Sequence, residues 1–137
     1  MSSYRTKDNT EEVLLALKKA KIRGLKTIGM TAERHAKEDP NMPVDTGLAR
    51  NSITFALAGE EANTKEYKAD KGDEKGVYNG TADGEKGEAV YIGSNVQYFP
   101  FIENGSRTIN ARHVLRNAAT NHTDEYKRLM EDSMKNA

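Results

Sequence analysis

The chain has 137 residues, of which 36% are hydrophobic, and its 21 basic side chains equal its 21 acidic ones. Because the net charge is zero, the protein has no overall electrostatic field that would attract nucleic acid or a membrane surface. The absence of cysteine excludes a disulfide framework and a thiolate metal site. The length fits one domain, residues 1–137. Its hydrophobic core is expected to be small, and oligomerisation would help to stabilise it. We expect no signal peptide and no membrane span, because no apolar run is long enough.

Residues 9–37 have the spacing of an amphipathic helix, which Asn9 or Thr10 would cap. Small and apolar side chains form one stripe along it, made of Val13, Leu14, Leu17, Ala20, Gly24, Leu25, Ile28 and Ala32. Gly24 and Gly29 each disfavour a helix by about 1 kcal/mol relative to alanine, so they indicate a kink or the close approach of another element. The prolines that follow end the helix.

Lys19, Arg23 and Lys26 share another face of this helix. Across residues 5–37, nine basic residues against four acidic ones leave a balance of +5. The simplest interpretation is a solvated face. The alternative is a charged contact with phosphates or with the acidic segment of a neighbouring subunit.

Asp45 or Thr46 would cap a short helix over residues 48–52. Residues 53–57 then alternate between apolar and polar side chains, which predicts a strand. The clearest strand of the chain comes later, at residues 89–93. These two strands are expected to form the sheet.

Residues 59–88 differ from the rest of the chain in composition. They hold six of the eleven glycines, and nine acidic residues against five basic ones leave a balance of −4. We predict a long exposed hairpin with a turn at Asp83-Gly84. Disorder over part of this segment is the alternative.

Residues 98–104 predict a short helix with Pro100 in its first turn, stopped by Gly105. A last helix over residues 111–134 has an apolar arc of Leu115, Ala118, Ala119, His122, Tyr126, Leu129 and Met130. Together the elements predict an α+β fold, with two main helices packed on a small antiparallel β-sheet and the long hairpin exposed.

No set of residues predicts catalysis, a cofactor or a metal. The histidines, at positions 35, 113 and 122, have no partner of their own type four residues away, and His122 is best explained as a hydrogen-bonded core residue. Ser94 lacks the Gly-x-Ser-x-Gly context of an activated nucleophile. The paired acids of the glycine-rich segment predict solvated loop charge, so we expect a protein that is not an enzyme.

Tyr98, Phe99 and Phe101 are a third of the aromatic residues of the chain. Core packing beneath the helices is one interpretation. An exposed part would instead anchor an interface, because aromatic side chains bury large areas at a low entropy cost.

Three blocks of sequence resemble a known family, the tail-completion or head–tail joining neck proteins of long-tailed bacteriophages. Residues 44–53, Val-Asp-Thr-Gly-Leu-Ala-Arg-Asn-Ser-Ile, are similar to the family's Val-Asp-Thr-Gly-x-Leu-Arg-x-Ser-Ile, with leucine directly after glycine here. Residues 90–105 resemble its strand, aromatic run and Glu-x-Gly. Residues 111–118 resemble its next block, although the family has prolines and a phenylalanine where His113, Val114 and Asn117 stand.

The resemblance implies a minor structural protein of the virion, made in the host cytoplasm, that forms a ring in the neck. The ring would be a homo-oligomer, a hexamer as the resemblance implies, between head-completion or portal-side proteins and the tail terminator or tail tube. DNA would pass through its lumen without sequence-specific contact. The candidate interface residues are Asp45, Thr46, Gly47, Arg50, Tyr98, Phe101, Glu103, Gly105 and Arg112, with Lys19, Arg23 and Lys26 as a charged contact face.

Two other functions remain open at this point. The chain could be a tail terminator or another ring subunit of a phage tail or tail-like particle. It could also be a non-specific nucleic-acid-binding module that uses the lysine and arginine face of the first helix, in which case its binding to duplex DNA would depend steeply on salt.

Overall fold

The computed structural model describes residues 2–137, with side chains from Thr10 onward. It confirms an α+β fold. The described elements are, in chain order, α1 (Ser2–Glu38), α2 (Leu48–Ser52), β1 (Thr54–Leu57), β2 (Glu66–Lys68), β3 (Lys75–Val77), β4 (Val90–Gly93), α3 (Phe99–Asn104), α4 (Val114–Thr120) and α5 (Thr123–Lys135). Within residues 2–137, no helix is both long and apolar enough to cross a membrane.

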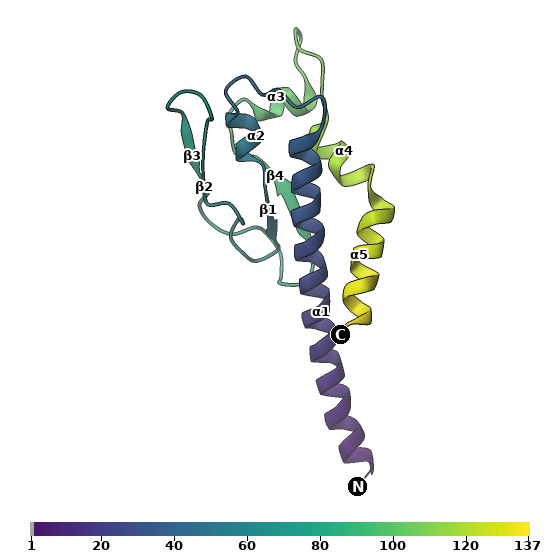
Figure 1. Ribbon diagram of the computed structural model, residues 1–137. Helices are drawn as coiled ribbons and strands as arrows, with labels where there is room; N and C mark the ends of the chain where they lie inside the picture. Colours follow the sequence, from purple (N-terminus) through teal and green to yellow (C-terminus); the bar gives the residue numbers. More distant parts are fainter. Residues whose placement is uncertain (1) are drawn as a thin grey trace.

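Helix α1 lies in the middle of the molecule (Figure 1). Strands β1 and β4 pair antiparallel on one side of it, with Phe55 opposite Ile92, and α4 and α5 pack on the other side. Strands β2 and β3 form a separate two-stranded sheet, with Tyr67 opposite Gly76. The two main helices therefore contact each other, and α1 separates α5 from the β1–β4 sheet.

The two glycines of α1 mark where its neighbours come closest. A Cβ on Gly24 would lie 2.7 Å from Sδ of Met130 in α5, and a Cβ on Gly29 would lie 2.6 Å from Cδ2 of Phe55 in β1. Real Cβ contacts are longer than this, so a side chain at Gly29 would push against the ring of Phe55, and one at Gly24 would require the flexible end of Met130 to shift. The close approach predicted from the sequence is confirmed, once toward each neighbouring layer.

The core lies where the last turns of α1 meet α2, α3 and α4. Its buried members are Ala36, Met42, Leu48, Ala49, Ile53, Ala69, Val96, Phe99, Val114 and Ala118. Helix α5 contributes no buried residue. It is an amphipathic surface helix that covers α1, and most of the burial lies at one end of the molecule.

Both ends of the long helices differ from the prediction. Helix α1 begins at Ser2, so Asn9 and Thr10 lie inside it and do not cap it. The predicted last helix is two helices, because the chain leaves helical geometry at His122, where φ is −127° and ψ is 29°. The hydroxyl of Tyr126 donates to the carbonyl of Ala118 and closes this corner.

The long hairpin predicted for residues 59–88 is not confirmed. The hairpin that forms is short, because only β2 and β3 pair, and the chain reverses between them instead of at Asp83-Gly84. The rest of the segment is loop. Hydrogen bonds of 2.9 Å from Gly59 N to Ala82 O and from Ala82 N to Glu60 O hold this loop against the end of β1.

Candidate functional site

The Val-Asp-Thr-Gly block fastens the β2–β3 hairpin to the body of the fold. The carbonyl of Thr46 accepts from the amides of Asp70 (2.7 Å) and Lys71 (3.1 Å), and its hydroxyl accepts from the amide of Leu48. Gly47 has φ +82°, and a Cβ there would lie 2.4 Å from Oδ2 of Asp70. Thr46 and Gly47 were predicted as interface residues, but their contacts give them an internal role.

Asp45 and Arg50 come from the same block and behave differently. Both are exposed, and neither makes a side-chain hydrogen bond or ion pair within the described part of the chain. Their exposure is what the interface role predicted from the sequence requires.

The Glu-x-Gly pair builds the corner between α3 and α4. The carboxylate of Glu103 accepts from the amides of Leu115 (2.8 Å) and Arg116 (3.0 Å), which are unpaired donors in the first turn of α4. This capping places the start of α4 at Val114 instead of residue 111. Gly105 has φ +77°, and a Cβ there would lie 2.7 Å from the amide nitrogen of Ala111.

Arg112 ties two loops together at this end of the molecule. One of its guanidinium nitrogens, Nη1, donates to the carbonyl of Asn41 at 3.0 Å, and its amide donates to the carbonyl of Ile102 at 2.9 Å. The loop of residues 105–112 therefore lies against the loop that follows α1, at the top of Figure 1. The side chain of Arg112 is still exposed to solvent.

The aromatic run divides between core and surface. Phe99 is 2% exposed and packs in the core, whereas Tyr98 is 41% and Phe101 53% exposed. The exposed pair are three residues apart, Tyr98 at the N-cap position of α3 and Phe101 in its first turn. We call Tyr98 and Phe101 the α3 patch. The interpretation as core packing is confirmed for Phe99, and the exposure of the other two rings is the condition that an interface anchor requires.

The turn after β4 is a hydrogen-bonded hub. Ser94 Oγ lies 2.6 Å from Oγ of Ser52, and no histidine or carboxylate of the described side chains, from Thr10 onward, makes a hydrogen bond to this pair. Asn95 accepts from the hydroxyl of Tyr67 at 2.5 Å, and its amide donates to the hydroxyl of Tyr78 at 3.1 Å. The pKa of Tyr78 is raised, mainly because burial disfavours the phenolate.

The N-terminal part of α1 extends beyond everything packed against it (Figure 1). A hydrogen bond of 2.6 Å from Ser133 Oγ to the carbonyl of Ala20 joins the end of α5 to α1. We call residues 11–19, which precede this contact, the arm. Its large apolar side chains are uncovered, with exposures of 56% for Val13, 60% for Leu14, 54% for Leu15 and 37% for Leu17. Val13, Leu14 and Leu17 belong to the apolar stripe predicted from the sequence. The sequence did not indicate that they remain exposed.

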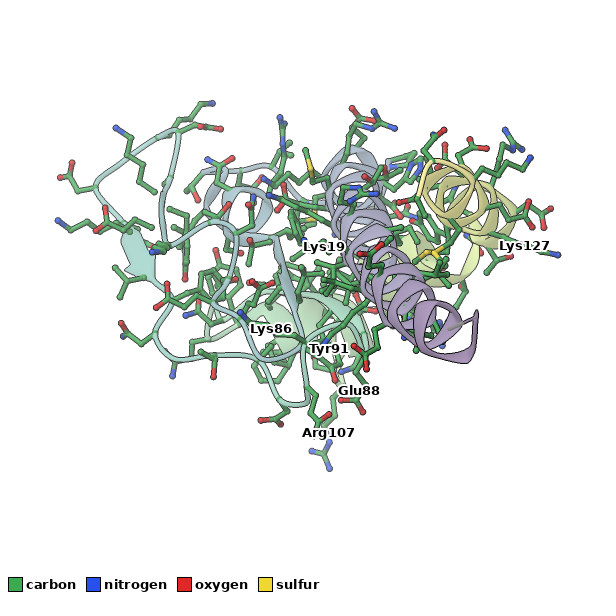
Figure 2. All side chains as sticks on the ribbon, turned by 90° about the horizontal axis from the view of Figure 1, so that it is seen from below. Lys19, Lys86, Glu88, Tyr91, Arg107 and Lys127 are labelled. Carbon is green, nitrogen blue, oxygen red and sulfur yellow. The ribbon has the colours of Figure 1, made fainter. Side chains whose placement is uncertain are left out.

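The charged contact face is exposed at Lys19, Arg23 and Lys26. Viewed along α1 from below (Figure 2), Lys86, Glu88 and Tyr91 lie on the sheet side of α1, and Lys127 points away from the molecule on α5. Lys26 lines the same hollow as Glu60 and Glu61 of its own chain, although no ion pair joins them among the described residues. Part of the acidic segment that was predicted to face a neighbour therefore lies beside the helix of its own subunit.

A cluster that the sequence did not predict joins α1 to the α4–α5 corner. Nε2 of His35 lies 2.6 Å from Oε1 of Glu125, and the ring of His35 stacks on that of His122 with centroids 3.6 Å apart and planes 2° from parallel. The hydrogen bond from His35 lowers the pKa of Glu125. His122 and Glu125 are three residues apart. A pattern of two histidines four residues apart therefore does not indicate this cluster.

Comparisons of the chain with protein-family models, with curated proteins and with solved structures found no match. The resemblance to neck proteins therefore depends on the motif residues themselves.

Proposed function

We propose that this protein is a structural subunit of a bacteriophage neck, which forms an oligomeric ring and joins the DNA-filled head to the tail. The motif resemblance supports this proposal. The observation that carries it is the arm, a helical segment that projects beyond the rest of the fold and exposes Val13, Leu14, Leu15 and Leu17. Apolar groups gathered on one projecting segment are typical of a surface that a partner covers.

A second copy of this chain is the partner that we propose for the arm. A ring needs a heterologous interface, in which each subunit offers two different surfaces. The arm lies at one end of α1, and the α3 patch lies beyond the other end (Figure 1). In this arrangement the arm of one subunit packs on the α3 patch of the next, and the ring closes when the rotation between subunits allows it.

The energies involved are adequate for a contact that forms on assembly. Complete burial of one leucine or valine side chain contributes about 1.5–3 kcal/mol. Several such side chains must also offset the translational and rotational entropy that association removes, which is about 4–15 kcal/mol. The balance favours a subunit that is monomeric at low concentration and assembles when a portal-side protein or the tail gathers several copies.

The ring would enclose DNA without reading its sequence. A chain with 21 basic and 21 acidic residues has no net charge to hold phosphates tightly, which suits a wall that DNA must slide past. No catalytic chemistry is needed for this role. The proposed neighbours are the head-completion or portal-side proteins on one side and the tail terminator or tail tube on the other, in the finished virion.

Loss of the chain from the particle tests this function. In a phage that encodes it, deletion of its reading frame should give DNA-filled heads and separate tails, and electron microscopy of the wild-type particle should place a ring of this chain between them. A ring at the far end of the tail tube would instead identify a tail terminator. Normal joined particles in the deletion strain would overturn both proposals.

Nucleic-acid binding is the second candidate, because Lys19, Arg23 and Lys26 are all exposed and Arg23 and Lys19 have no ion-pair partner among the described residues. Fluorescence anisotropy with a labelled DNA duplex, titrated at rising salt, separates it from the first. Tight binding by the isolated protein that weakens steeply with salt would favour this candidate. A neck subunit of neutral charge should show weak binding at every salt concentration.

A further inference from the structure

We propose that His35, His122 and Glu125 form a binding site for a divalent metal ion of the zinc class. Their ligand atoms, one from each side chain, all lie within 4.8 Å of one another. Two imidazoles and one carboxylate are a ligand set that zinc uses in proteins, with the fourth position left to water. This site goes beyond the proposed ring function and does not depend on it.

The ligand atoms can still bind a metal ion. The side chain of His122 makes no hydrogen bond to any residue of the described part of the chain, and Oε2 of Glu125 makes none either. Side-chain exposures of 20% for His35 and 41% for Glu125 leave the cluster open to solvent on one side. An ion would therefore gain ligands whose existing contacts are one hydrogen bond, one ring stack and a tilted ring contact of each histidine with Tyr126.

Coordination requires a small rearrangement of the side chains. Around a tetrahedral zinc ion, ligand atoms at about 2.0–2.2 Å from the metal are roughly 3.4 Å apart. The 2.6 Å contact between His35 and Glu125 must lengthen, and the stacked rings must tilt toward a common point because imidazole lone pairs lie in the ring plane. All of these changes are rotations of side chains at a surface, without movement of the core.

A hollow of about 340 Å³ beside the cluster supplies an entry path. The residues that line it include His35, His122, Glu38, Asp39, Asn117 and Asn121. The two acidic side chains at its rim favour the approach of a cation. Because His35 belongs to α1 and the other two ligands to the α4–α5 corner, a bound ion would link these elements directly.

Calorimetric titration of the metal-free protein with zinc chloride tests the proposal. We expect saturable binding of one Zn²⁺ per chain and a rise in Tm that chelation with EDTA reverses, since an ion that binds only the folded state stabilises it. His122→Asn and Glu125→Gln should each weaken binding by at least about tenfold, because changes even outside the ligand shell have effects of this size. Circular dichroism checks that both variants are folded.

His113→Asn is the matched control, because His113 is the remaining histidine of the chain and lies outside the cluster. Its positive φ of 50° is one that asparagine tolerates, so the fold should be preserved. Zinc binding should be unchanged in this variant. No saturable binding to the folded wild-type protein would overturn the site, and so would binding that survives both ligand substitutions or falls equally in the control.

Discussion

The two halves of α1 carry one continuous apolar stripe, yet they have opposite surroundings. From Ala20 onward the stripe is covered, and Ala20, Ala32 and Ala36 are 0–5% exposed. Before Ala20 the same stripe faces solvent at Val13 and Leu14, which are 56% and 60% exposed. The difference lies in what packs against each half, since α5, β1 and β4 all end before they reach the arm.

An amphipathic pattern indicates which face of a helix is apolar. It does not indicate whether that face packs within its own chain or against another chain. In the covered half, small residues let α5 and β1 approach closely, which is a signature of contacts within one chain. The arm instead exposes leucine and valine side chains. Apolar side chains gathered on an exposed helix suit a contact that forms between chains.

The largest effect is expected in the covered half, from Gly29→Val. The new side chain would meet Phe55 and Val90 at distances below 3 Å, and overpacking of this kind costs about 3 kcal/mol. Chemical denaturation followed by circular dichroism measures the loss. Gly93→Val is the matched control, because a Cβ at Gly93 has nothing within 4 Å, and equal losses in the two variants would contradict the packing described for α1.

A smaller effect is expected from Tyr78→Phe, which removes the hydroxyl that donates to the carbonyl of Ser52 at 2.5 Å. The buried carbonyl loses its partner, so stability should fall by about 1–2 kcal/mol. This change acts on the hub beside the sheet and should leave the arm unaffected. Denaturation midpoints in urea at neutral pH provide the measurement.

The alkaline pH dependence checks the same side chain. The pKa of Tyr78 in the folded state is raised above its ordinary value of 10.0, so its contribution is complete below pH 10 and is lost as pH rises through the folded pKa. The wild-type protein should therefore lose more stability above pH 10 than Tyr78→Phe does. An equal loss in both proteins would assign the alkaline transition to other groups.

Glu103→Gln should cost about 1 kcal/mol, because the amide keeps only a weaker, neutral version of the cap on α4. Thermal unfolding monitors the change. Glu66→Gln, an exposed glutamate on β2, is the control and should be neutral. If the Glu103 variant were as stable as the control, the capping role would be wrong.

The smallest effect on folding is expected in the arm. Leu14→Asp should change the stability of the monomer by less than about 0.5 kcal/mol, because this side chain is 60% exposed. It should nevertheless abolish assembly in sedimentation velocity. Val77→Asp, which changes an exposed apolar residue outside both proposed surfaces, should leave assembly intact.

Local signals in the sequence were sufficient for much of the fold. The stripe of α1, the glycines at close approaches and the stop at Gly105 each depend on the residue itself and its neighbours. The predicted cap was placed wrongly, because Gly47 is the N-cap residue of α2, and the hydroxyl of Thr46 accepts from the amide of Leu48 from one position before it. The long hairpin was not confirmed, because composition alone does not set strand pairing, which here depends on Thr46 and Asn95 holding β2 and β3 from a distance. The break at His122 was missed because the apolar arc continues across it.

The candidate site was predicted less completely, for a physical reason. Motif residues were expected to face a partner, but Gly47, Glu103 and Gly105 are set by contacts within the chain that no spacing rule reveals. The cluster of His35, His122 and Glu125 joins residues 90 positions apart, so only the packing of α5 on α1 brings it together. Asp45, Arg50 and the α3 patch remain exposed, as an interface requires.

Disulfide trapping between subunits tests the central claim, that the arm of one copy packs on the α3 patch of the next. The chain has no cysteine, so Leu14→Cys and Phe101→Cys each introduce a single thiol. Mixed at a concentration at which the wild-type protein assembles and then oxidised, the two variants should form a cross-linked dimer that contains one of each, and either variant alone should form little. Efficient cross-linking of Leu14→Cys alone, or none in the mixture, would contradict the claim.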